Sequence, residues 1–239
     1  MVNRKKEETG MDRQQIGDII ATKNAPLVIG EGRSEKYRRV VLKNEGYVIL
    51  LAGSSLEMEE LVIYEQNPAH DFVARGKDGE DGAPGCDGED AFDGGRIELF
   101  IGRLSDNIRV VNQGGKGGDG GFGGRGGDGG AGFMNGKGAP GGDGGNGGNG
   151  GRGGKGPALV LKYATDCGSS VETVCEKGPG GSGGVPGSGG NGGRNGNSDT
   201  FAPDGKPGER GKDGEPGEKG SVEIVLLNEQ DSVTKKEGR

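Results

Sequence analysis

The sequence is poor in the residues that build a conventional hydrophobic core. It has no tryptophan, 4% aromatic residues and 28% hydrophobic residues in a chain of 239. These shortages exclude one large core of Leu, Ile, Val and Phe. No apolar run follows the basic N-terminal residues, and none is long enough to cross a bilayer. We therefore expect no signal peptide and no membrane insertion, and a cytoplasmic or virion-associated location.

Residues with versatile chemistry are scarce as well. His70 is the only histidine, and the three cysteines show no CxxC spacing. A catalytic base needs a nucleophile and an orienting partner, and the sequence groups none, so we expect no enzyme activity and no cofactor. The net charge of -7 argues against a nucleic-acid partner.

Glycine is the abundant residue, with 59 copies, and it recurs at every third position. A period of three belongs to the polyproline II conformation, which rises about 3.1 Å per residue. Only glycine allows such backbones to approach closely enough to hydrogen-bond. Runs of 19 residues, each roughly 59 Å long as a rod, cover 76–94, 114–132, 138–156, 178–196 and 202–220, with alanine replacing glycine at 91 and 202.

The composition of the runs predicts which rods have neighbours. The three central runs consist largely of G-G-X triplets, so we expect two glycine faces and an interior position. The first and last runs are G-X-Y with charged residues, which indicates the edges of the assembly. Between runs, the five-residue stretches 133–137 and 197–201 contain turn formers and should reverse the chain.

The predicted fold class is mostly β and irregular structure with little or no α-helix. We expect an antiparallel bundle of five polyglycine II helices clamped by short β-strands and β-hairpins. Alternating apolar residues predict the hairpins at 96–113 and 157–177. The expected divisions are a polar N-terminal arm at 1–35, a β-rich segment at 36–75, the bundle at 76–220, and a C-terminal strand with a polar tail at 221–239.

The stretches GPGG, GGNGG and GGRGGKG resemble polyglycine II bundle proteins. Such proteins include the snow flea antifreeze protein, the N-terminal domain of Obg-type GTPases and adhesins of phage long tail fibres. The resemblance covers the rods, about two fifths of the chain. Charged residues such as Lys116 and Asp143 differ from the small side chains of an ice-binding face. The P-loop of a GTPase is absent, and the expected tip turns are shorter than adhesin loops.

The last run, GKPGERGKDGEPGEKG, is similar to collagen. That resemblance implies a trimer of chains, as the alternative to rods that pack within one chain. A triple helix of five triplets would be very short, which favours rods within one chain.

A calcium-ordered repeat is a further alternative. GGKGGD and GGRGGD recur nine residues apart and match the start of the calcium-binding repeat G-G-x-G-x-D-x-U-x. Asp119 and Asp128 would then be ligands. However, Gly121 and Gly130 stand where the repeat has a large apolar residue. Solvated surface aspartates are the competing interpretation.

These patterns predict a non-enzymatic structural protein that uses a rigid glycine-rich scaffold and assembles with copies of itself. The alternative function is a receptor-binding adhesin of a phage or phage-like tail fibre, with a cell-surface receptor or glycan as its partner. The candidate interaction residues lie in the expected tip turns: Phe133, Met134, Asn135, Asp199, Thr200 and Phe201.

Overall fold

The computed structural model describes residues 17–165 and 168–227, and these residues contain eleven β-strands and no helix. None of them therefore lies in a helix that could cross a membrane. The bounds are β1 Asp18–Ala21, β2 Leu27–Ile29, β3 Ser34–Leu42, β4 Val48–Leu51, β5 Ser55–Ile63, β6 Phe72–Arg75, β7 Arg96–Leu104, β8 Ile108–Gln113, β9 Ala158–Thr165, β10 Val171–Glu176 and β11 Ser221–Leu226.

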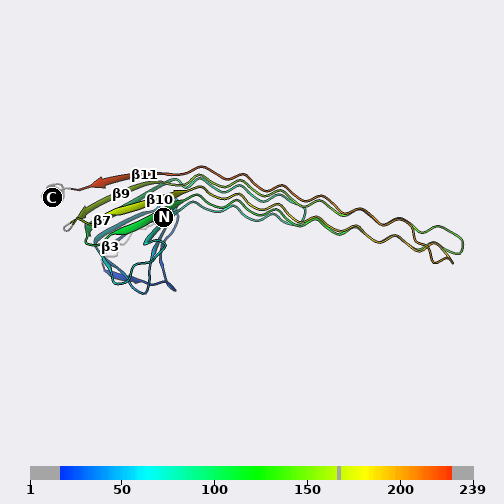
Figure 1. The fold of residues 1–239 in the computed structure, drawn as a ribbon, viewed down its shortest axis with the longest axis horizontal. Helices are drawn as coiled ribbons and strands as arrows, with labels where there is room; N and C mark the ends of the chain where they lie inside the picture. The colour runs from blue at the N-terminus through cyan, green and yellow to red at the C-terminus, as the bar shows by residue number, and fades with distance from the viewer. Residues whose placement is uncertain (1–16, 166–167, 228–239) are drawn as a thin grey trace, which may run out of the picture.

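Odd-numbered and even-numbered strands form two separate sheets. The six-stranded sheet has the order β1-β3-β5-β7-β9-β11, and the five-stranded sheet has the order β10-β8-β6-β4-β2. Every neighbouring pair is parallel. The chain therefore winds from one sheet to the other and back, adding one strand to each sheet per coil (Figure 1).

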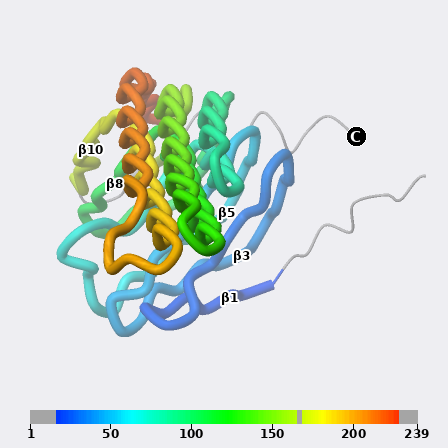
Figure 2. Tube along the Cα trace, turned by 90° about the vertical axis from the view of Figure 1, so that its right-hand side faces the viewer, coloured from blue at the N-terminus to red at the C-terminus, as the bar shows by residue number. Residues whose placement is uncertain are grey.

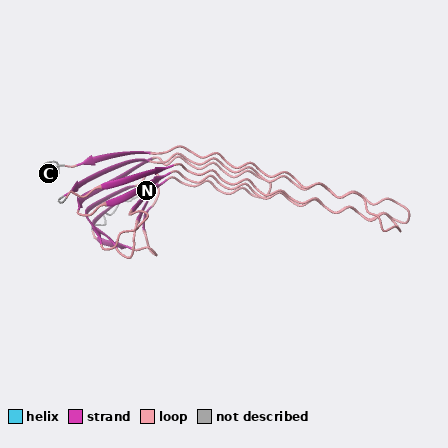
Figure 3. Cartoon of the chain, viewed as in Figure 1, coloured by secondary structure: helices cyan, strands magenta, loops and turns pink. Residues whose placement is uncertain are grey.

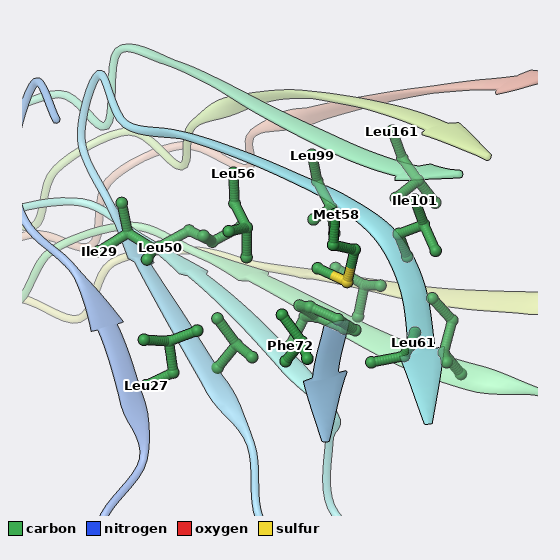
Figure 4. Packing of buried hydrophobic residues seen from close by; sticks show 14 of the residues in the cluster. Leu27, Ile29, Leu50, Leu56, Met58, Leu61, Phe72, Leu99, Ile101 and Leu161 are labelled. Atoms are coloured by element: carbon green, nitrogen blue, oxygen red, sulfur yellow. The ribbon is translucent and has the colours of Figure 1, made fainter. Parts of the chain in front are cut away.

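Successive coils repeat with a regular step at the start of the chain. Asp18 pairs with Arg39, and Arg39 pairs with Glu60, so each coil advances 21 residues (39 - 18 and 60 - 39). Side chains alternate in burial along the strands, as β7 shows from Ile97 to Ile101. The inward residues of both sheets form one core, which includes Leu56 and Phe72 (Figure 4). The body, as we call the two sheets, is thus stabilised by the apolar side chains that it buries between them.

The predicted fold class was wrong about how the elements are arranged. The described residues form two parallel sheets, not a bundle of five polyglycine II helices clamped by short strands and hairpins. The hairpin expected at 96–113 consists of β7 and β8, which belong to different sheets, and the one expected at 157–177 consists of β9 and β10, which also separate. Each strand pairs with one a full coil away. Apolar residues alternate along a strand in a hairpin and in a coil alike, so the alternation does not show which strand it pairs with.

The glycine runs are insertions between strands of successive coils. Residues 76–94 lie between β6 and β7, 114–156 between β8 and β9, and 178–220 between β10 and β11. Each insertion leaves the body as an extended segment and returns beside itself, outside any strand (Figure 3). Viewed from the far end, the three insertions lie side by side (Figure 2). We call them together the arm.

The first run is folded back on itself and is therefore not a single rod. The Cys86 N–H donates to the Ala83 carbonyl at 2.8 Å, and Gly85 has a positive φ of 77°. Beyond this turn, the Glu89 N–H donates to Glu80. Pro84 and Gly85 are the turn residues within the run. The arm consequently contains one short hairpin and two long ones.

The two long hairpins reverse near the stretches expected to be turns. The Ala139 N–H donates to the Gly130 carbonyl across the first, and the Ala202 N–H donates to Gly193 across the second, both at 2.8 Å. The collagen-like run bonds within the same chain, since the Gly205 N–H donates to Gly190. Of the predicted N-terminal arm, residues 1–16 lie outside the described residues, whereas the rest contains β1, β2 and the beginning of β3.

Candidate interaction surface: the arm and its tip

The arm is held together by backbone hydrogen bonds that recur every third residue. The N–H groups of Gly120, Gly123 and Gly126 donate at 2.8 Å to carbonyls of the neighbouring long hairpin. A Cβ added at Gly120 would lie 2.0 Å from the Gly148 carbonyl oxygen. Glycine is therefore required here by the close approach of two backbones, and not by a positive φ.

Asp and Asn side chains add a second set of bonds between the segments, which we call the side-chain rungs. Each uses a side-chain oxygen to accept a backbone N–H from the neighbouring segment. Asp119 accepts the Ser182 N–H at 2.7 Å, and Asp128 accepts the Asn191 N–H at 2.8 Å. The further rungs start from Asp78, Asp81, Asp87, Asp90, Asp93, Asp143, Asn146, Asn149, Asp204 and Asp213.

The structure does not bring Asp119 and Asp128 together as calcium ligands. Lys116 Nζ donates to Asp119 at 2.9 Å, and Arg125 donates to Asp128 at 2.7 Å, in addition to the rungs. The bond from Lys116 holds the pKa of Asp119 below its ordinary value. Within residues 17–165 and 168–227, no three His, Cys, Asp or Glu side chains are grouped to hold a metal ion. Both aspartates instead link the long hairpins.

The tip of the arm, residues 133–137 and 195–201, exposes large apolar side chains. Phe133 is 81% exposed, and Met134 and Phe201 are each 63% exposed. Asn135, Asp199 and Thr200 are exposed as well. All six candidate interaction residues therefore lie at the end of the arm that points away from the body (Figure 1).

Hydrogen bonds tie the two turns of the tip into one unit. The Asn197 N–H donates to the Met134 carbonyl at 2.8 Å, which links the turns directly. Within the second turn, Arg194 donates to the Asp199 carboxylate at 2.8 Å, and Asn195 donates to the Thr200 hydroxyl at 3.0 Å. The tip thus presents its apolar side chains on a hydrogen-bonded support.

The His70–Asp71 pair lies in the body and forms part of its packing. The His70 ring contacts Tyr47 edge-on at 4.9 Å between ring centroids. Asp71 is buried, and its Oδ2 accepts the Arg109 N–H at 2.9 Å. Burial lowers the pKa of His70 and raises that of Asp71. Asp71 thus links the start of β6 to the start of β8.

A shallow polar pocket lies at the base of the arm, where the short hairpin meets a long one. Asp90 accepts the Arg152 N–H at 2.7 Å, and Asp93 accepts the Lys155 N–H at 3.2 Å. Lys155 Nζ also lies 3.6 Å from the Glu218 carboxylate. The side chains of Asp90, Asp93, Lys155 and Glu218 therefore join the segments around the pocket.

Sequence reasoning missed the side-chain rungs. It treated the acidic and amide residues as surface groups or calcium ligands, although a signal was present. Asp or Asn recurs at a fixed place in many of the triplets, for example in GKDGED and GGDGGNGGN. A side chain in fixed register with a three-residue helix points repeatedly at the same neighbour. Regular spacing of short acceptors therefore indicates bonds to an adjacent backbone.

No known protein family and no curated protein matches this chain. Among solved structures, one similar chain is the nine polyproline type II helical bundle of the springtail antifreeze protein from Granisotoma rainieri, whose crystal waters match the ice lattice. The identity is 26%, over 63% of this chain and 97% of that one, and the TM-score is 0.12. This TM-score does not indicate a common overall fold.

Proposed function

We propose that this protein is a non-enzymatic structural protein, a scaffold with a stiff arm, which assembles with copies of itself. The observation that carries the proposal is how the arm is built. Its segments are joined by backbone bonds at three-residue intervals, with no room for a Cβ between them. A structure without interlocking side chains offers little for substrate recognition, but it resists bending, because bending must break many bonds at once.

The body supports self-assembly through the edges of its larger sheet. Among the described residues, β1 pairs only with β3, and β11 pairs only with β9. An exposed strand edge offers unpaired backbone groups to another chain. Since all strands are parallel, β11 of one copy can continue the sheet at β1 of the next. Such head-to-tail contact does not close on itself, and the expected product is a filament.

Negative-stain electron microscopy with light scattering tests this assembly. We expect filaments of the wild-type protein, with or without a calcium chelator. Ile224→Lys on β11 should shorten them, because a charged edge strand discourages pairing. Tyr64→Lys, at an exposed position just beyond β5, is the matched control and should leave them intact. Particles that remain single copies at every concentration would contradict self-assembly, and disassembly by the chelator would favour the calcium alternative.

The apolar tip favours adhesion as a second candidate function. Phe133 and Phe201 are exposed at the end of the arm, where a binding partner is not obstructed by the body. We expect Phe133→Ala with Phe201→Ala to abolish binding to whole cells or surface glycans if the protein is an adhesin. Phe122→Ala is the control, because Phe122 is also exposed, at 68%, but lies along the arm. Equal binding by both variants, or none by the wild type, would exclude this function.

A further inference from the structure

One face of the arm is covered by the short hairpin over only part of its length. Near the body, Gly79 donates to the Lys116 carbonyl and Gly85 donates to the Phe122 carbonyl, both at 2.9 Å. The short hairpin then turns back at Gly85, whereas the long hairpins continue toward the tip (Figure 1). The face beyond Phe122 consequently has no segment of this chain over it among the described residues.

The glycine pattern continues across this uncovered stretch. A Cβ at Gly118 or Gly121 would lie 1.9 Å from a carbonyl oxygen of the short hairpin. In contrast, a Cβ at Gly124, Gly127 or Gly130 would meet nothing within 4 Å, and none of the three has a positive φ. Nothing in the described chain therefore requires glycine at these three positions.

The returning segment of the same hairpin changes at the same level. A Cβ at Gly148 would lie 1.8 Å from the Cys86 carbonyl oxygen. At Gly142 and Gly145, the nearest atoms would be 3.2 and 3.1 Å away, in the neighbouring segment of the same hairpin. We call the uncovered surface the distal glycine face, and it consists of Gly124, Gly127, Gly130, Gly142 and Gly145.

Other outward surfaces of the arm carry side chains. The last run exposes Lys206, Glu209 and Lys212 where no segment covers it. Glycine loses more conformational freedom on ordering than any other residue. The distal glycine face is thus an exception among the uncovered surfaces of the arm. Its composition is that of the part that the short hairpin covers.

The distal glycine face also carries unused backbone groups in the same register. In the covered part, the Gly118 and Gly121 N–H groups donate to the short hairpin. Among the described residues, none accepts a hydrogen bond from the N–H of Gly124, Gly127 or Gly130. Carbonyl oxygens that alternate with them also have no described donor; these belong to Arg125, Asp128 and Ala131. In the covered part, the donors bond to the returning segment of the short hairpin and the acceptors to its outgoing segment. The uncovered rows therefore offer donors and acceptors to two neighbouring extended segments, such as those of another glycine-rich hairpin.

We propose that the distal glycine face docks against the same face of a second copy, with the two arms antiparallel. The inference rests on the proposed scaffold function and names a second self-assembly surface, separate from the sheet edges. A two-fold arrangement matches each donor row to an acceptor row, because both faces carry both kinds of group. It also matches lengths, since each uncovered stretch runs from Phe122 to the tip.

The antiparallel arrangement gives the apolar tip a partner. The tip of one copy reaches the level at which the short hairpin of the other copy turns back. Exposed Phe133 then lies against the exposed turn of Ala83 and Pro84, next to Cys86. Burial of these apolar groups adds a hydrophobic contribution to the backbone bonds. The two bodies lie at opposite ends of the dimer.

Sedimentation velocity over a concentration series tests the proposal. Each uncovered rod is only about 30 Å long, at ten residues, so in the Ile224→Lys background, where assembly through the sheet edges is blocked, we expect dimers at the upper end of the series. Gly124→Val with Gly127→Val should remove the dimer without changing the thermal unfolding of the arm, because both added side chains point into open space. Ser182→Val with Ser188→Val is the matched control on another exposed surface of the arm and should dimerise normally.

A disulfide test reports the orientation of the arms. Phe133→Cys should form an intermolecular disulfide with Cys86 under mild oxidation, and Phe133→Cys with Cys86→Ser should reduce the cross-linked fraction at least tenfold. A wild-type protein that sediments as a monomer throughout would overturn the proposal. So would association that survives the two valines but is lost in Ile224→Lys, and that result would leave assembly through sheet edges standing. Arm dimers without filaments would instead support the distal face and contradict the edges.

Discussion

The body and the arm of this molecule use side chains in opposite ways. In the body, side chains such as Phe72 and Leu56 are fully buried between two sheets. In the arm, carbonyl oxygens occupy the places where a Cβ would be, as between Gly120 and Gly148. The body is therefore stabilised by the apolar surface it buries, whereas the arm is stabilised by backbone bonds that depend on missing side chains.

This difference predicts opposite sensitivities to mutation. Removing atoms should harm the body, because a cavity remains where the side chain was. Adding atoms should harm the arm, because two backbones must separate to admit them. Four predictions, ordered from the largest expected effect to the smallest, test how far the comparison holds.

Phe72→Ala should have the largest effect. Phe72 is fully buried in β6 and contacts the core from the five-stranded sheet. Truncating a buried Phe to Ala costs about 3–5 kcal/mol of unfolding free energy. Urea denaturation followed by circular dichroism measures this loss. A loss below about 1 kcal/mol would mean that the arm, and not the core, determines the stability of the body.

Gly120→Ala should disrupt the arm by about 1–3 kcal/mol, since its Cβ would overlap the Gly148 carbonyl. Hydrogen exchange of the arm N–H groups should accelerate, while the protection of the strands stays the same. Gly127→Ala is the matched control, because its Cβ meets nothing. It should be neutral or stabilise the arm by about 0.4–1 kcal/mol, by restricting the unfolded chain. Equal effects of the two substitutions would show that close approach is not the reason for glycine.

Asp128→Ala should remove the acceptor of one side-chain rung. The Asn191 N–H would lose its acceptor, and Arg125 would lose its ion pair. We expect a loss of about 1 kcal/mol from the hydrogen bond, with little from the exposed ion pair. Asp128→Asn keeps an acceptor and should retain most of the stability. Faster exchange at Asn191 in the alanine variant alone would locate the effect in the rung.

The pH dependence should have opposite signs in the two regions. Hydrogen bonding to Lys116 lowers the pKa of Asp119, so its contribution to arm stability is present above its ordinary pKa of 3.8 and is lost as the pH falls through the lowered value. Burial raises the pKa of Asp71, so its contribution to body stability is present below 3.8 and is lost as the pH rises through the raised value. Asp119→Asn and Asp71→Asn should each flatten one of these dependences.

Unfolding measured from about pH 2 to pH 6 tests both signs. Local hydrogen exchange separates the arm from the body within the same samples. If Asp71→Asn steepened the dependence in the body, desolvation of Asp71 would not be the cause of its raised pKa.

Period and composition predicted the extent of the glycine runs and the turns at 133–137 and 197–201. They did not predict the sheets, because β7 and β8 are separated by only three residues and this spacing is also that of a hairpin. The 21-residue step from Asp18 to Arg39 was a signal of coiling, but it extends over too few coils to stand out. The turn at Gly85 was signalled by Pro84, although the glycine period continues through the turn and concealed it.

The sequence alone determined that backbones must lie against one another in the arm, since glycine at every third position removes the Cβ from one side of an extended chain. Which glycine rows are covered depends on how the strands of the body pair. The coil places each insertion next to its neighbour and brings the short hairpin over Gly118 and Gly121, but not over Gly127. The physical reason is that the three-residue period is local, whereas the position of each hairpin depends on strand pairing between residues tens of positions apart.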